Sequence, residues 1–396
     1  MNRFISKILM LLLLLSFLSL ENVKFVYVNG SIKCNENDFI YADKLDTSNL
    51  IQCLPDKIFD RLTLTNLDLS NSNLTYFPSK IQLFKKLVSL DLSYNLLTDI
   101  CDLPISLKYI YLNHNKLKTL PKHLSTLVNL KILDLRHNIL TKIPNFIRKF
   151  TNLNYINFSN NKISEINSII GELTKVKKFK FKHNKIKNLP NSINKLNTLC
   201  SMNLSYNKLT EFPDNCENLN KLKKLKLSYN SIINIETICK IKSIEILSLF
   251  NNKISMIPKN IYKLKKLKEF NLSDNNILSL PKEITKCNNL KFLCLSNNLL
   301  KNIEIICRIK TLKELSLYNN KISKIPDNIS NLKNLKVLDL FDNNISNLPK
   351  NLKKCKNLRF LYLNKNKISQ IPIELFSLLS NLKSLDFKRK SYYLSC

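Results

Sequence analysis

Apolar and polar residues follow one short pattern along most of the chain, L-x-x-L-x-L-x-x-N-x-L. In the segment LVSLDLSYNLL, Leu90 and Leu92 alternate with Ser89 and Asp91, which is the period of a strand with one buried face. Asn95 follows at the point where the chain turns inward. Each copy of the pattern therefore predicts a short strand that ends in a turn.

The pattern returns at a nearly constant interval over about fifteen units. The interval is 23 residues in most units, 22 after Asn230 and Asn298, and 20 after Asn95. Ser72 takes the asparagine position one unit earlier, and Ser48 marks a degenerate first unit. A single unit cannot bury its own apolar side, so stacked units must supply the core. The asparagine position is held by Asn95, Asn115, Asn138, Asn161, Asn184, Asn207, Asn230, Asn252, Asn275, Asn298, Asn320, Asn343 and Asn366.

Most units continue into a return segment that opens with proline. Proline is tolerated at the first helical position, where its missing N–H has no intrahelical partner in any case. We therefore expect short helices or 3₁₀ turns on the outer surface. These prolines are Pro78, Pro121, Pro144, Pro190, Pro213, Pro258, Pro281, Pro326, Pro349 and Pro372.

The strand pattern, the asparagine and the repeat length resemble the leucine-rich repeat family over about residues 45–387. The resemblance implies an α/β fold, a curved solenoid or horseshoe with a parallel concave sheet and short helices or 3₁₀ turns on the convex side. It also implies that each ladder asparagine bonds backbone groups of adjoining turns. The proline-bearing 23-residue units look like the Ras-suppressor-like class, and the 22-residue units like the phosphatase-regulator class. Residues 21–44 would form an N-terminal cap or linker, and residues 388–396 a basic tail.

The first twenty residues form a separate segment. Arg3 and Lys7 precede an apolar run from Ile8 to Leu20, which is the pattern of a secretory signal. The run is short for a membrane span, which needs about 20 residues. We expect residues 1–20 to be a cleaved signal peptide of a secreted or cell-surface protein. A retained membrane anchor and a hydrophobic leader on a cytoplasmic protein stay open.

The chain is strongly basic, with 63 Lys and Arg against 29 Asp and Glu and a net charge of +34. Such a field attracts nucleic acid, anionic membranes or acidic proteins. Coding bias is an alternative cause, because residues with AT-rich codons are abundant while Gly occurs twice and Trp never. The net charge alone therefore identifies no partner.

Catalytic motifs are missing from the sequence. No segment outside the repeats exceeds about 45 residues, and G-x-x-x-x-G-K-[ST], H-E-x-x-H and G-x-S-x-G do not occur. His114 and His137 lie in neighbouring units, roughly 5 Å apart, but no third metal ligand accompanies them. We expect no enzyme, cofactor or metal. No C-x-x-C pair occurs, and Cys34 and Cys53 flank the first unit and could form a disulfide.

Binding is the better candidate. The resemblance implies that variable strand positions line a concave surface that recognises proteins. Aromatic side chains often anchor interfaces, although tyrosine is simply abundant here. The candidate partner-binding residues are Tyr94, Tyr111, His114, His137, Lys178, Lys180, Lys182, Tyr206, Lys224, Lys226 and Tyr229.

Charge along the strands favours a protein partner. A lysine-rich centre lies between units that carry Asp68, Asp91 and Asp134 on one side and Glu245 and Glu269 on the other. Nucleic acid would require a continuous basic track with stacking aromatics. A membrane would be a partner only if the N-terminal segment is retained. The sequence thus predicts a non-enzymatic, secreted or surface-exposed protein that binds another protein through its concave face. The alternative is an intracellular signalling scaffold for Ras-like GTPases or protein phosphatase 1.

Overall fold

The computed structural model describes residues 25–28, 31–34, 64–77, 79–380 and 382–386. The chain divides into two compact units, Met1–Lys162 and Ile163–Cys396. The predicted signal peptide, most of the predicted cap and the basic tail lie outside the described residues. The side chains of Cys34 and Cys53 lie outside them too, as does Pro78.

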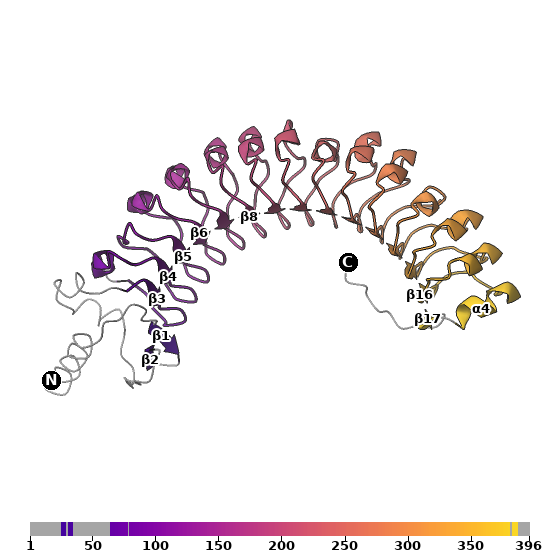
Figure 1. Cartoon of the computed structure of the whole chain (residues 1–396), viewed down its shortest axis with the longest axis horizontal. Coiled ribbons are helices and arrows are strands. Elements are labelled where there is room, and N and C mark those ends of the chain that lie inside the picture. Colours follow the sequence, from indigo (N-terminus) through magenta and orange to yellow (C-terminus); the bar gives the residue numbers. More distant parts are fainter. Residues whose placement is uncertain (1–24, 29–30, 35–63, 78, 381, 387–396) are drawn as a thin grey trace. The chain divides into compact units, whose positions relative to one another are not determined.

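In the first unit, five short strands form a parallel sheet in chain order (Figure 1). Before them, β1 (Phe25–Val28) and β2 (Ser31–Cys34) pair antiparallel. The sheet strands are β3 (Asn66–Asp68), β4 (Ser89–Asp91), β5 (Tyr109–Tyr111), β6 (Ile132–Asp134) and β7 (Tyr155–Asn157). The 3₁₀ turns are η1 (Ser79–Leu83), η2 (Lys122–Thr126) and η3 (Asn145–Lys149).

The second unit repeats this arrangement with ten parallel strands (Figure 1). They are β8 (Lys178–Lys180), β9 (Ser201–Asn203), β10 (Lys224–Lys226), β11 (Ile246–Ser248), β12 (Glu269–Asn271), β13 (Phe292–Cys294), β14 (Glu314–Ser316), β15 (Val337–Asp339), β16 (Phe360–Tyr362) and β17 (Ser384–Asp386). The returns are η4 (Ser168–Glu172), η5 (Asn191–Lys195), η6 (Cys216–Asn218), η7 (Ile238–Lys240), η8 (Lys259–Lys263), η9 (Lys282–Lys286), η10 (Ile306–Arg308), η11 (Asp327–Asn331), η12 (Lys350–Lys354), η13 (Ile373–Leu375) and α4 (Phe376–Leu379).

The alternation read from the sequence places the core between the strands and the returns. In β4 the central Leu90 is fully buried while Ser89 and Asp91 are half-buried. Ile81 in η1 is also fully buried, so the return closes the other side of the core. Within each unit the strands line the inner, concave side and the turns the outer, convex side (Figure 1). This arrangement matches the expected solenoid.

The return prolines take a different position from the predicted one. Pro121 precedes η2 as its N-cap, in extended conformation with φ −69° and ψ 150°, and is not its first helical residue. The Pro121 carbonyl accepts the Leu124 N–H at 3.2 Å. An extended residue at this place supplies the acceptor for the first i→i+3 bond and needs no N–H of its own. The same cap occurs at Pro144, Pro190, Pro258, Pro281, Pro326, Pro349 and Pro372.

Almost all returns are 3₁₀ turns, and α4 is the one α-helix among the described residues. The return from Pro372 to β17 is one residue longer than the return from Pro349 to β16. That extra residue gives α4 the length for an α-helical turn. In the described part of the chain, no helix combines the length and apolar character needed to cross a bilayer.

Candidate functional site

The ladder asparagines fix where each strand ends. The Asn207 Oδ1 accepts the Ile186 N–H at 3.0 Å, and its Nδ2 donates to the Phe181 carbonyl at 2.9 Å and the Leu204 carbonyl at 3.0 Å. Asn95 makes the equivalent bonds in the first unit, including one from its Nδ2 to the Leu69 carbonyl at 2.8 Å. One side chain therefore joins two successive turns.

The residue before the ladder position is held in left-handed conformation. In the described units its φ lies between 49° and 58°. Asn and Asp tolerate this region, whereas bulky residues rarely adopt it. Eight of these positions carry Asn, Asp or Lys, but six carry an aromatic ring: Tyr94, His114, His137, His183, Tyr206 and Tyr229. Such outliers are a reason to look for function.

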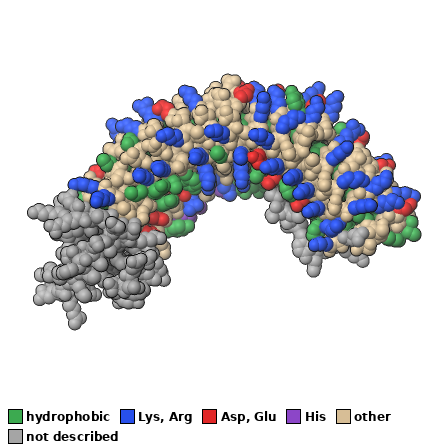
Figure 2. All heavy atoms as spheres, in the orientation of Figure 1, with side chains coloured by type: hydrophobic (Ala, Val, Ile, Leu, Met, Phe, Trp, Pro, Cys, Tyr) green, Lys and Arg blue, Asp and Glu red, His purple; other side chains and the backbone are tan. Residues whose placement is uncertain are grey.

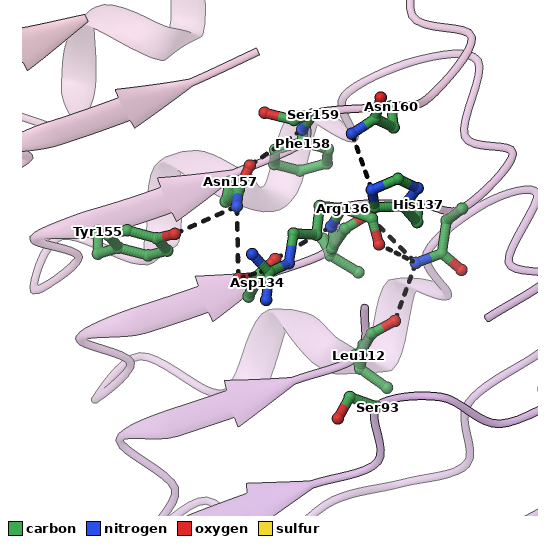
Figure 3. Close-up of polar contacts among 12 residues, drawn as sticks. Ser93, Leu112, Asp134, Arg136, His137, Tyr155, Asn157, Phe158, Ser159 and Asn160 are labelled. Atoms are coloured by element: carbon green, nitrogen blue, oxygen red, sulfur yellow. Dashed lines mark hydrogen bonds and ion pairs between the residues drawn. The ribbon is translucent and has the colours of Figure 1, made fainter. Parts of the chain in front are cut away.

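In the first unit, Tyr94, His114 and His137 form a continuous stack, which we call the first rail. The Tyr94 and His114 ring centroids are 4.1 Å apart, and those of His114 and His137 are 4.0 Å apart. The His137 Nε2 lies 3.0 Å from the Asn160 Nδ2, which extends the row by one turn (Figure 3). Stacking of this kind contributes about 0.5–1.5 kcal/mol and offsets part of the cost of the left-handed backbone.

In the second unit, His183, Tyr206 and Tyr229 form the second rail. Their successive ring centroids are 3.9 Å and 4.0 Å apart, and Phe250 meets Tyr229 edge-on at 5.0 Å. The Lys182 ammonium lies 5.0 Å from the centre of the Tyr206 ring. A hydrogen bond with Tyr206, followed by burial, raises the pKa of the Tyr229 phenol. This rail thus combines rings with a cation.

The two histidines of the first rail favour the neutral state. Partial burial is the main cause that lowers the pKa of His114 and of His137. The positive charge of Arg136 lowers both pKa values further, the neighbouring His137 lowers that of His114, and Asp134 opposes these effects. Two stacked imidazolium rings would repel each other, so protonation works against the stack.

Four lysines gather on the strands next to the second rail, and we call them the lysine cluster. Strands β8 and β10 flank β9, so Lys178 and Lys224 lie on either side of Ser201. Lys180 and Lys226 likewise lie on either side of Asn203. Neighbouring strands are about 4.8 Å apart, which puts each pair of lysines roughly 10 Å apart at the backbone.

No carboxylate belongs to β8, β9 or β10. Glu245, just before β11, lies 2.7 Å from the Lys268 ammonium and 3.5 Å from that of Lys223. A hydrogen bond from Lys268 is the main cause that lowers the pKa of Glu245. This carboxylate is therefore engaged by lysines outside the cluster, and the cluster keeps a positive potential.

The acidic and amide residues that end many strands have a structural role that the sequence did not indicate. The Asp134 Oδ1 accepts the Arg136 N–H at 3.1 Å, and the Asn157 Oδ1 accepts the Ser159 N–H at 3.1 Å (Figure 3). Asp134 and Asn157 are also buried. Such side chains stabilise the turn and do not project toward a partner. The same bond occurs at Asp68, Asp91, Asn203, Asn271 and Asp339.

The structure brings some of the binding residues predicted from the sequence together and leaves others apart. Lys182, Tyr206 and Tyr229 meet in the second rail beside the lysine cluster. Tyr111 stands apart from the first rail on β5, in register between Asp91 and Asp134. Burial first, and then these carboxylates, raise the pKa of the Tyr111 phenol.

Two ring or amide neighbours were not identified from the sequence, Asn160 and Phe250. Asn160 shares the position before a ladder asparagine, which is a signal that could have identified it. Phe250 lies one residue earlier, and nothing in the repeat pattern indicates its contact with Tyr229. Among the described residues, no group of three His, Cys, Asp or Glu side chains could hold a metal ion.

Known proteins with this geometry are numerous among solved structures. A leucine-rich repeat protein of Leptospira interrogans is 32% identical, with a TM-score of 0.77, over 85% of this chain and 86% of that chain. The plant peptide hormone receptor RGFR1, in complex with RGF2, is 29% identical over 81% of this chain and 55% of that chain, with a TM-score of 0.68. The Listeria monocytogenes internalin InlF shares the fold at 23% identity and a TM-score of 0.68, over 86% of this chain and 93% of that one.

Matches to family models also indicate leucine-rich repeats. The model described as leucine-rich repeats in two copies matches residues 105–149, 128–173, 310–354 and 333–374. The single-repeat model matches residues 266–287. No curated protein matches the chain. Repeats of this family generally serve as protein-binding scaffolds and not as enzymes. The stacked strands, the asparagine ladder and the Leptospira relative together place this chain in the leucine-rich repeat family.

Proposed function

We propose that the chain binds an acidic segment of a protein partner on the concave side of the Ile163–Cys396 unit. The observation that carries the proposal is the lysine cluster, set beside the second rail on β8–β10, three strands that contain no carboxylate. Lys178, Lys224 and Lys226 make no ion pair with a described carboxylate. A partner carboxylate would therefore meet several ammonium groups at once.

The second rail gives the same surface an anchoring edge. Tyrosine offers a large rigid contact area and a hydroxyl group, which suits interface anchors. Ser201 provides a neutral polar group between Lys178 and Lys224. We infer that charge attracts and orients the partner, and that the rings and Ser201 fix its position.

We further propose that the protein acts outside the cell or at its surface. The basic start and apolar run of residues 1–20 support this, and the plant receptor shows a related solenoid in complex with RGF2. N-terminal sequencing of the protein from its native cells tests the idea. A new N-terminus shortly after residue 20 in secreted material is the expected result, and an intact N-terminus in cytosol would contradict it.

An intracellular scaffold for Ras-like GTPases or protein phosphatase 1 is the second candidate. Five buried cysteines of the described chain are free, although Cys294 is disulfide-bonded. Burial is the main cause that raises the pKa of Cys216, Cys239 and Cys307 to about 12, which keeps these thiols protonated. Unpaired thiols are typical of reducing compartments. Pull-downs from cytosol that recover neither partner class would count against this candidate.

Charge reversal tests the concave site directly. A labelled glutamate-rich peptide serves as the probe, and its affinity is measured by fluorescence polarisation at fixed salt. We expect Lys180→Glu with Lys226→Glu to weaken binding at least about tenfold, since close charge pairs at interfaces contribute more than about 1.4 kcal/mol. The free energy of unfolding should stay within about 1 kcal/mol of the parent.

The matched control carries the same charge change elsewhere on the same unit. Lys185 and Lys208 are exposed and lie outside the strands. Lys185→Glu with Lys208→Glu should keep most of the affinity. Equal losses in the two double variants would mean that net charge, and not the lysine cluster, attracts the peptide.

A further inference from the structure

The last return differs from the other proline-led returns at two outward-facing positions. The residue after the return proline is polar in the earlier described turns, such as Lys122, Lys259 and Lys350, but it is Ile373 in the last one. The fourth residue after that proline is Gln, Ser, Arg, Asn, Glu, Tyr, Thr or Lys in the earlier turns, but it is Phe376 in the last one.

These two apolar side chains protrude into solvent. Ile373 is 74% exposed and Phe376 is 56% exposed, which puts them among the most exposed large apolar residues described. Both lie in the last turn, in η13 and α4. Two exposed apolar side chains three residues apart in one turn are a candidate interaction surface.

A lysine-lined hollow reaches the last turn at Ser377, the residue after Phe376. This hollow of about 620 Å³ on the same convex side is lined by Lys333, Lys353, Lys354, Lys356, Asn357 and Ser377. None of the described residues that line it is a carboxylate. The one acidic neighbour in the last turn, Glu374, already holds the Lys350 ammonium at 2.6 Å. Figure 2 shows hydrophobic side chains next to lysines at this end of the unit.

We propose that this end of the Ile163–Cys396 unit docks on an anionic lipid surface. Ile373 and Phe376 enter the interface between headgroups and acyl chains, and the lysines of the hollow contact headgroup phosphates. Basic residues beside exposed Phe and aliphatic side chains are the combination by which peripheral proteins bind such surfaces. This inference is independent of the proposed protein partner on the concave side.

The shape of the patch favours lipid over an acidic protein. Its apolar residues stand out from the surface, whereas a folded partner is usually anchored by side chains that fill pockets. A soft interface accepts protruding side chains without a matching cavity. The charged residues that line the hollow are all lysines, whose compact charge suits a diffuse anionic surface better than bidentate recognition of single carboxylates.

Vesicle co-sedimentation of the full chain is the test, with phosphatidylcholine vesicles that contain or lack phosphatidylserine. We expect binding only with phosphatidylserine. Ile373→Ser with Phe376→Ser should weaken it about tenfold. Lys353→Gln, Lys354→Gln and Lys356→Gln together should weaken it on the order of a hundredfold, since each lysine near the surface contributes about fivefold.

Matched controls separate this patch from general attraction by a chain of net charge +34. Met256→Ser removes an apolar side chain that is 73% exposed elsewhere in the unit. Lys185→Gln, Lys187→Gln and Lys208→Gln remove three exposed lysines away from the hollow. Both controls should retain most of the vesicle binding, and circular dichroism should show every variant folded.

Three results would overturn the proposal. The first is binding that does not depend on phosphatidylserine, and the second is an equal loss in the patch variants and their controls. The third is that the patch variants weaken binding of a glutamate-rich peptide and leave vesicle binding unchanged. That result would assign the surface to an acidic protein.

Discussion

A ladder asparagine satisfies backbone groups that would otherwise be buried without partners. Asn207 bonds one N–H and two carbonyl groups from two successive turns. Asn207→Ala should therefore lower the free energy of unfolding by about 1–3 kcal/mol. Urea titration measures the change. Asn197→Ala, at an exposed position in the same unit, should change it by less than about 0.5 kcal/mol. Equal effects at the two positions would contradict the structural role of the ladder.

The first rail makes stability depend on pH. Because the pKa values of folded His114 and His137 lie below their ordinary value of 6.5, the unfolded chain binds protons more readily. The two histidines therefore contribute fully to the free energy of unfolding above about pH 6.5. This contribution declines as the pH falls through the lowered pKa values. We expect the chain to lose stability on acidification from about pH 7.5 to about pH 5.5.

Variants that keep the rings but cannot titrate in this range test that cause. Tyrosine already occupies the equivalent position at Tyr94, Tyr206 and Tyr229. His114→Tyr with His137→Tyr should reduce the pH-dependent loss measured by urea unfolding. A pH profile unaffected by the double variant would show that these histidines do not cause the dependence.

At the scale of elements, the packing between successive returns leaves no spare volume at Gly171. This glycine is buried in η4, and a β-carbon placed there would lie 2.5 Å from the Ser192 carbonyl oxygen of η5. The backbone at Gly171 or Ser192 must therefore move to make room for a β-carbon. Gly171→Ala should cost about 1–3 kcal/mol of unfolding free energy. Glu172→Ala, one residue on and exposed, should cost less than about 0.5 kcal/mol. A neutral Gly171→Ala would show that the two turns can separate freely.

Strands could be predicted from the sequence more completely than returns. The alternation around Leu90 fixes which side chains enter the core, and the parallel sheet follows from stacking of the repeats. The returns depend on finer geometry. Pro121 lies one residue before the turn and not inside it, because an i→i+3 turn uses its carbonyl as an acceptor. No local pattern distinguishes these two positions.

The candidate site shows a similar division. The basic centre on β8 and β10 was evident from lysine positions alone, and the resemblance to leucine-rich repeats indicated the concave face. The roles of Asp134 and Asn157 were not evident, because their bonds to the backbone two residues on appear only in the folded turn. The contact between Phe250 and Tyr229 likewise depends on side-chain direction, which the repeat spacing does not fix.

For the whole molecule, the net charge of +34 is less informative than its distribution. In the Ile163–Cys396 unit, one lysine group lies on the concave strands and another lines the hollow that reaches the last turn at Ser377. Figure 2 also shows lysine and arginine side chains spread over the outer turns. We infer that the two named groups act as separate surfaces, one for an acidic protein segment and one for anionic lipid.

Site-specific photo-crosslinking in the native cells tests the central claim most directly. A photoreactive phenylalanine analogue is placed at Tyr206 in the second rail and, as control, at Tyr262 in the convex turn η8. We expect Tyr206 to capture a protein through an acidic segment, and Lys180→Glu with Lys226→Glu to abolish the capture. Capture of that protein from Tyr262 alone, or capture from Tyr206 that survives the charge reversal, would contradict it.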